Sequence, residues 1–221
     1  MADVERFIRE TVDHLPPNHR CRVFLEVIAR NVLGYNAREV PSGVEGFSAE
    51  AREALGKEGY VIYQLTGKSI RTLRENGLEI WSTCQDNPGI EDLPSRRTEV
   101  AINPDQFFLP ESNGKTLAEQ ERMVKKFSRN LRKKIKGVKA ILGKAPDYVE
   151  VAFIHLQTTN RYLFGEGDNF GKDTRTKTRE VGECVVRVGA FSAKKNALMV
   201  GHGHPDFAWD DVWAAPLIVP V

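Results

Sequence analysis

The most regular hydrophobic pattern in the chain lies between Thr116 and Lys139. Apolar side chains recur there at the three- and four-residue intervals of one helical face, and basic side chains fill most other positions. Thr116 followed by Glu119 has the spacing of a capping box, in which each side chain accepts a hydrogen bond from the other residue's backbone amide. The pattern therefore predicts one long, basic, amphipathic helix that packs across a sheet.

Shorter helical patterns occupy the amino-terminal part of the chain. The first covers residues 3–15 and ends at a Pro-Pro pair, and the second begins after Asn18 and stops at Gly34. Two short helices joined by such a turn predict a helical hairpin. A further short helix is predicted to begin at Ser48, which completes a helical part over residues 1–57.

The period of the pattern changes after this helical part. Residues 60–65, 78–84 and 96–102 are rich in β-branched and aromatic side chains, which favour strands. Residues 68–77 lie between the first two of these runs and predict a short helix that is closed by an Asn-Gly pair. These elements make up a mixed part over residues 58–145.

The last part of the chain, residues 146–221, is predicted to be rich in strands. The predicted strands are residues 148–156, which return through 161–164 as a hairpin, and residues 181–191, 197–201 and 213–219. Pro216 has no amide hydrogen, so the last strand is expected at a sheet edge or a bulge.

Together the elements predict one α+β domain over residues 1–221. It has an N-terminal helical hairpin, a central long basic amphipathic helix on a mostly antiparallel sheet, and a β-rich C-terminal third. Its composition is ordinary for a globular protein, with 41% hydrophobic and 28% charged residues. The formal net charge is only +2, so attraction to a polyanion has to come from local clusters of cations.

The cysteines and the hydropathy bear on the compartment. The 3 cysteines form no CxxC pair, which is unlike a disulfide scaffold or a zinc knuckle. No window is apolar enough to span a membrane, and the amino terminus lacks the pattern of a signal peptide. We therefore expect a soluble, cytoplasmic protein that binds no membrane and needs no cofactor.

One short motif indicates a possible metal site. Residues 202–206, HGHPD, resemble the opening of the HxHxDH motif of the metallo-β-lactamase family, in which alternate side chains bind zinc. Phe207 stands where that motif has its next histidine, and the motif comes early in that family but near the carboxyl end here. The resemblance implies a metal-dependent hydrolase with His202, His204 and Asp206 as ligands, which we keep as an alternative.

No other motif supports catalysis. The NGKT sequence at residues 113–116 lacks the earlier glycine of a phosphate-binding loop, and a turn followed by a helix cap explains it. Cys84 and Cys184 become candidate nucleophiles only if the fold brings one thiol beside His155 or His202, which no spacing indicates. We assign no catalytic residue and expect a binding protein rather than an enzyme.

Two basic segments remain as candidates for function. The first is the outer face of the long helix. The second is residues 172–179, KDTRTKTR, where an extended backbone would put the cations on one face and the threonines on the other. Side chains of this kind hold phosphate backbones. The candidate polyanion-binding residues are Arg122, Lys125, Lys126, Arg129, Arg132, Lys133, Lys136, Arg175, Lys177 and Arg179.

The preferred interpretation is a non-enzymatic protein that contacts a polyanion, with nucleic acid as the partner. A structural or assembly protein that docks its basic face on an acidic protein surface is the second hypothesis. A face of solvated cations that the protein's own 30 acidic residues neutralise would need no partner at all.

Overall fold

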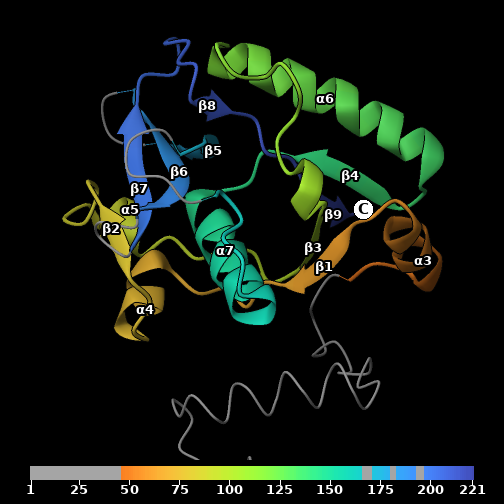
Figure 1. Cartoon of the computed structure of the whole chain (residues 1–221), viewed down its shortest axis with the longest axis horizontal. Coiled ribbons are helices and arrows are strands. Elements are labelled where there is room, and N and C mark those ends of the chain that lie inside the picture. The colour runs from red at the N-terminus through yellow and green to blue at the C-terminus, as the bar shows by residue number, and fades with distance from the viewer. Residues whose placement is uncertain (1–45, 166–170, 180–182, 193–196) are drawn as a thin grey trace, which may run out of the picture. The chain divides into compact units, whose positions relative to one another are not determined.

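The computed structural model describes residues 46–165, 171–179, 183–192 and 197–221. These residues belong to one compact unit of the chain, Glu45–Val221. The predicted hairpin lies outside the described residues. The described part has an α+β fold with two mostly antiparallel sheets (Figure 1).

The first sheet has four strands in the order β1-β3-β9-β4, and each neighbouring pair is antiparallel. These strands are β1 (Val61–Gln64), β3 (Glu99–Ile102), β4 (Val138–Ile141) and β9 (Leu217–Pro220). The strand nearest the carboxyl end of the chain, β9, is therefore an inner strand. All four residues of β3 are buried, as expected for an inner strand that is covered on both faces.

The second sheet has five strands in the order β2-β7-β6-β5-β8. These strands are β2 (Ile80–Ser82), β5 (Asp173–Arg179), β6 (Val185–Ser192), β7 (Ala197–Gly203) and β8 (Val212–Trp213). The inner pairs β7-β6 and β6-β5 are antiparallel, whereas β2 pairs with β7 and β8 with β5 in parallel. The two parallel pairs bring together segments that are far apart in the sequence.

Most of the described helices begin at a side-chain cap. They are α3 (Ala49–Lys57), α4 (Ile70–Glu75), α5 (Pro88–Glu91), the short 3-10 helix η1 (Pro104–Gln106), α6 (Leu117–Lys134) and α7 (Ala145–Thr159). The Ser48 side chain caps α3, which confirms the helix predicted there, and Ser69 caps α4 in the same way. Asn87 and Asn103 cap the two helices that begin with proline.

The long helix α6 begins on the predicted capping box. The Thr116 hydroxyl accepts from the backbone amide of Glu119 at 3.3 Å, and the Glu119 carboxylate accepts from the amide of Thr116 at 2.8 Å. Both bonds satisfy amides that have no partner within the helix, so the NGKT sequence is a turn and a cap. At the other end, Gly137 has a φ of 74°, which allows the sharp turn into β4.

The core has two hydrophobic clusters on the two faces of the four-stranded sheet. On β9, Leu217 and Val219 belong to the larger cluster, which contains much of α7 and the inner face of the five-stranded sheet. Ile218 points the other way into the smaller cluster, with Val124 of α6 and Leu55 of α3. Thus α7 lies between the sheets, at the centre of Figure 1, and α6 and α3 cover the opposite face.

The prediction of a strand over residues 148–156 is wrong, because this segment lies in the helix α7. The run is apolar and β-branched, and burial covers nearly every side of the helix from Ala145 to Phe153, so no polar face marks the helical period. Its start does carry a helical signal, since Pro146 lies in the first turn and Asp147 accepts from the backbone amide of Lys144. The predicted return strand at 161–164 is a turn.

The prediction of one last strand over residues 213–219 is also wrong. The structure divides it between β8, in the five-stranded sheet, and β9, in the four-stranded sheet. Pro216 lies between them. It has no amide to donate, so it separates the two strands, and β9 is an inner strand rather than an edge strand.

Candidate functional site

The outer face of α6 carries most of the predicted polyanion-binding residues. They follow a spacing of three and four residues, which keeps them on one side of a helix with 3.6 residues per turn. All of them are exposed: Arg122, Lys125, Lys126, Arg129, Arg132, Lys133 and, just beyond the helix, Lys136. We call these residues the α6 basic face. The buried Val124 and Leu131 lie on the opposite side, against the sheet.

The ion pairs of the described residues leave the α6 basic face without carboxylate partners. The pairs that involve α6 join Lys134 to Glu58 at 3.6 Å and Glu121 to Lys177, and neither uses a member of the face. The pKa of Glu119 is lowered, first by its hydrogen bonds to Thr116 and only last by Lys115 and Arg122. Among the described residues, Glu119 thus influences the face only weakly, and no carboxylate forms an ion pair with it.

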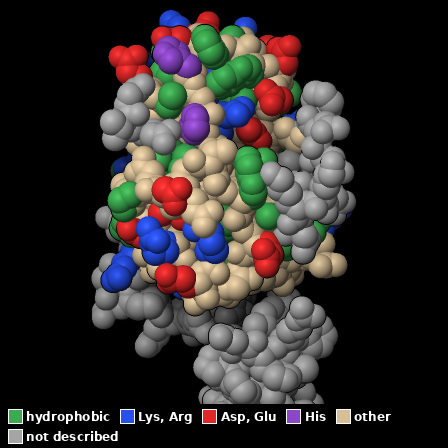
Figure 2. All heavy atoms as spheres, turned by 90° about the vertical axis from the view of Figure 1, so that its left-hand side faces the viewer, with side chains coloured by type: hydrophobic (Ala, Val, Ile, Leu, Met, Phe, Trp, Pro, Cys, Tyr) green, Lys and Arg blue, Asp and Glu red, His purple; other side chains and the backbone are tan. Residues whose placement is uncertain are grey.

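Elsewhere on the surface, cations lie beside acids. In the lower half of the side shown in Figure 2, Lys and Arg side chains alternate with Asp and Glu side chains. On α4, the exposed Arg71 pairs with the exposed Asp92 at 2.5 Å. This contrast distinguishes the α6 basic face from an ordinary mixed surface.

The second predicted basic row, on β5, does not form a continuous exposed surface. Arg175 is 0% exposed, and its guanidinium donates to the backbone oxygens of Lys115, at 2.7 Å, and Phe207. Burial, and then the neighbouring Arg187, lower the pKa of Arg175 to about 10. A fully buried side chain cannot reach a polyanion, so Arg175 leaves the candidate set.

The other two cations of β5 are exposed. Lys177 pairs with Glu121 in the first turns of α6, so this strand and the helix lie side by side there. Arg179 lies at the end of β5. The threonines at 174, 176 and 178 are buried on the opposite face, as the alternation predicts.

The structure leaves His204 beside Asp206 and turns His202 toward Thr83. The His202 Nδ1 atom lies 3.2 Å from the Thr83 hydroxyl, toward β2. His204 lies 3.9 Å from a carboxylate oxygen of Glu183 and, through its other nitrogen, 3.9 Å from one of Asp206. Within the described ranges, no three His, Cys, Asp or Glu side chains are grouped in a way that could hold a metal ion.

One thiol does come close to an imidazole. The parallel pairing of β2 with β7 places Ser82 opposite Val200, and the next residues bring the Cys84 sulfur to 3.9 Å from His202 Nδ1. Cys84 is only 1% exposed, so its thiol is closed to a substrate. His155 instead lies 2.7 Å from the Tyr63 hydroxyl, and burial followed by Arg161 lowers the pKa of this histidine.

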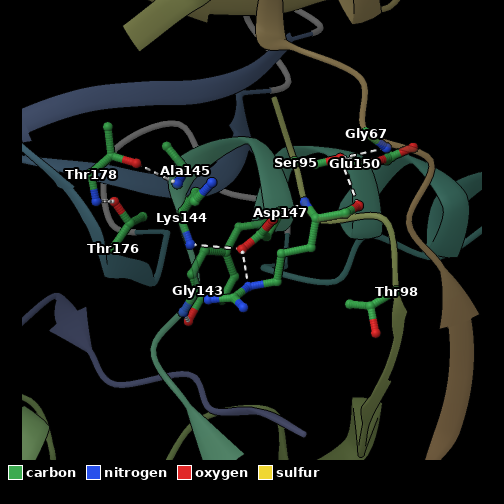
Figure 3. Close-up of polar contacts among 12 residues, drawn as sticks. Gly67, Ser95, Thr98, Gly143, Lys144, Ala145, Asp147, Glu150, Thr176 and Thr178 are labelled. Atoms are coloured by element: carbon green, nitrogen blue, oxygen red, sulfur yellow. Dashed lines mark hydrogen bonds and ion pairs between the residues drawn. The ribbon is translucent and has the colours of Figure 1, made fainter. Parts of the chain in front are cut away.

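The start of α7 is held by a buried carboxylate that the sequence analysis missed (Figure 3). Asp147 accepts from the backbone amides of Lys144 and Arg96, each at 2.8 Å, and pairs with the Arg96 side chain at 3.2 Å. On the other side, the Thr178 hydroxyl accepts from the amide of Ala145 at 2.9 Å. The amino end of α7 is therefore filled by the protein's own groups and has no room for an external anion.

A second buried carboxylate, Glu150, lies one turn further along α7 (Figure 3). It accepts from the amide of Thr66 at 3.1 Å and from the hydroxyl of Ser95 at 2.5 Å, and Ser95 in turn accepts from the amide of Gly67 at 3.1 Å. These bonds tie α7 to the loops after β1 and before β3. We interpret Asp147, Glu150 and their partners as structural, because both carboxylates accept hydrogen bonds from the protein's own donors.

The comparisons with known proteins do not identify a function. No family model, no curated protein and no solved structure matches the chain. In the part of the chain that the structure describes, no helix combines the length and the hydrophobicity that a membrane crossing requires.

Proposed function

We propose that the α6 basic face binds nucleic acid through its phosphates and that the protein acts by binding rather than by catalysis. The observation that carries this proposal is a row of exposed cations without carboxylate partners among the described residues. Maintaining unpaired like charges on one helical face costs stability, which an anionic partner offsets. Lys177 lies beside the first turns of α6, where it pairs with Glu121, and Arg179 is a further exposed cation at the end of the same strand.

The dimensions of the face suit a phosphate backbone. From Arg122 to Lys133 the helix rises about 16 Å at 1.5 Å per residue. A DNA duplex carries one negative charge about every 1.7 Å along its axis, so several phosphates lie within reach of this row. The aromatic side chain on this helix, Phe127, is half-buried against the core. We therefore expect binding through the backbone, with little dependence on base sequence.

A salt titration tests the proposal directly. A fluorescently labelled duplex and a single strand are titrated with the full chain at several salt concentrations. Affinity should fall as salt rises, with a slope of log K on log salt of about −0.9 per phosphate contacted on a duplex. A variant without three central charges should bind more weakly, with a slope shallower by up to about 3. It combines Lys125→Gln, Arg129→Gln and Arg132→Gln.

A matched variant controls for net charge. It removes three exposed cations from other elements: Lys57→Gln, Lys68→Gln and Arg71→Gln. Two of these are already in surface ion pairs, which contribute little to stability. The control should keep most of the affinity and the slope. Equal losses in the two variants, or no binding at low salt, would contradict the proposal.

The same titration separates the second hypothesis, an acidic protein partner. In that case nucleic acid would fail to bind, while size-exclusion chromatography would show an oligomer or a complex that depends on the same three cations. Competition between an acidic protein and nucleic acid for the face would instead place both on one site.

A further inference from the structure

A hollow lined by aromatic side chains has no α6 residue in its lining. Its volume is about 490 Å³, and its walls are formed by residues 104–108, 162–165, 171–172 and 213. The rings of Phe107, Phe108 and Phe164 contact one another at centroid distances of 5.2 to 6.1 Å. Trp213 continues this wall, 6.1 Å from Phe108. A volume of this size is typical of small-ligand pockets.

The side chains that line the hollow include one cation. The exposed Lys172 ammonium lies 4.8 Å from the ring centroid of Trp213 and 5.4 Å from that of Phe108, and it has no ion pair among the described residues. Tyr162 and Trp213 are half-buried residues of the lining, and their side chains carry a hydroxyl and an indole N–H. One carboxylate, that of the exposed Asp105, also belongs to the lining.

We propose that this hollow binds a small aromatic anion. The flat ring of the ligand packs against Phe108 and Trp213 where the Lys172 ammonium lies in the free protein, and the ammonium moves aside and binds the negative group of the ligand. Offset or edge contacts between aromatic rings are favourable beyond the area they bury, and an ammonium beside apolar walls attracts an anion more strongly than it does in open water. A nucleotide and an aromatic carboxylate share this chemistry, and the test separates them.

Isothermal titration calorimetry of the full chain with four probes tests the assignment. Adenosine monophosphate and 1-naphthoate each carry a ring and a negative charge, adenosine carries the ring alone, and inorganic phosphate carries the charge alone. We expect adenosine monophosphate or 1-naphthoate, or both, to bind. The affinity should be at least about tenfold higher than that of adenosine or inorganic phosphate, because one charged contact contributes about 1.5–3 kcal/mol. The probe that binds more tightly shows whether the ligand is a nucleotide or an aromatic carboxylate. If neither adenosine monophosphate nor 1-naphthoate binds more tightly than adenosine and inorganic phosphate, or if no probe binds, the proposal is overturned.

Exposed residues of the lining provide variants that should leave the fold intact. Lys172→Gln should weaken binding about tenfold, and Lys172→Arg should restore it. Asp105→Asn should tighten binding, because it removes a negative charge from the wall. Lys115→Gln, an exposed lysine outside the lining, is the control and should have no effect. Unchanged affinity in Lys172→Gln, or weaker binding in Asp105→Asn, contradicts the assignment.

This site is independent of the α6 basic face, and the experiments distinguish them. Removing Lys125, Arg129 and Arg132 should change the salt dependence of nucleic-acid binding and leave the affinity for the small anion unchanged. Lys172→Gln should do the reverse. Failure of one proposal therefore does not decide the other.

Discussion

The guanidinium of Arg175 joins three segments that are distant in the sequence. It projects from β5 and donates to Lys115, just before α6, and to Phe207, in the loop after β7. Further bonds hold the same loop to the start of α6, from the amide of Gly114 to Trp209 at 2.9 Å and from that of Leu117 to Pro205 at 2.8 Å. The buried guanidinium of Arg175 thus holds the amino end of α6 in place.

We predict that Arg175→Met destabilises the protein. The side chain keeps its apolar stem, but two backbone oxygens lose charged donors, and hydrogen bonds to charged groups contribute about 1.5–3 kcal/mol each. Relief from burying a charge offsets part of this, so a loss of about 2–4 kcal/mol is expected. Urea unfolding measures it. Arg179→Met, at an exposed position of the same strand, should change stability by less than about 0.5 kcal/mol. Similar effects of both variants would contradict the role given to Arg175.

At the scale of elements, α6 has a well-capped amino end and several positive charges at its carboxyl end. The capping box satisfies its first amides, and its last turn carries Arg132, Lys133 and Lys134, whose charges suit the negative end of the helix dipole. Stability of the helix and exposure of its cations are therefore compatible. The buried Gln120, which donates to Ser112 and Val212 at 2.9 Å each, adds a polar contact beneath the helix.

We predict that Thr116→Ala lowers the free energy of unfolding by about 1 kcal/mol, because one cap hydrogen bond is lost. Asn130→Ala, at an exposed position in the middle of α6, should raise the free energy of unfolding by roughly a few tenths of a kcal/mol, because alanine favours a helix more than asparagine does. Urea unfolding of both variants provides the measurement. A cap variant that is as stable as the original chain would show that this hydrogen bond does not stabilise the fold.

At the scale of the whole molecule, β9 connects the parts of the described fold. It pairs with β3 and β4 in the four-stranded sheet, and its side chains point alternately into the two hydrophobic clusters. An inner strand of this kind makes the two clusters depend on each other. We therefore expect the described part to unfold cooperatively.

We predict that Ile218→Ala destabilises the described part by about 2–5 kcal/mol, because it leaves a cavity where the side chain is fully buried. Val61→Ala, at an exposed position of the edge strand β1, should cost well under about 1 kcal/mol. Circular dichroism of helix and near-ultraviolet absorption of aromatic side chains should give the same transition for Ile218→Ala. A transition that differs between the two signals would contradict cooperative unfolding.

Local patterns determined much of this fold. The capping box at Thr116, the cap at Ser48, the strands around Tyr63 and Val100, and the α+β class follow from spacing and side-chain type over a few residues. They could be predicted because each depends on contacts within one turn or one strand. The α7 helix could not, because burial on nearly all sides removes the polar face that would mark its period.

Only the tertiary structure decided which charges face solvent and which segments meet. Charge and spacing place Arg175 and Arg179 in the same row, but the loop that contains Phe207 covers one and leaves the other exposed. The aromatic hollow likewise joins Phe108 and Trp213, which no short pattern relates. The sequence by itself determined the α6 cations and their helical spacing. The sequence does not show whether these cations have carboxylate partners among the described residues. That depends on segments distant in the sequence, which only folding brings close to α6.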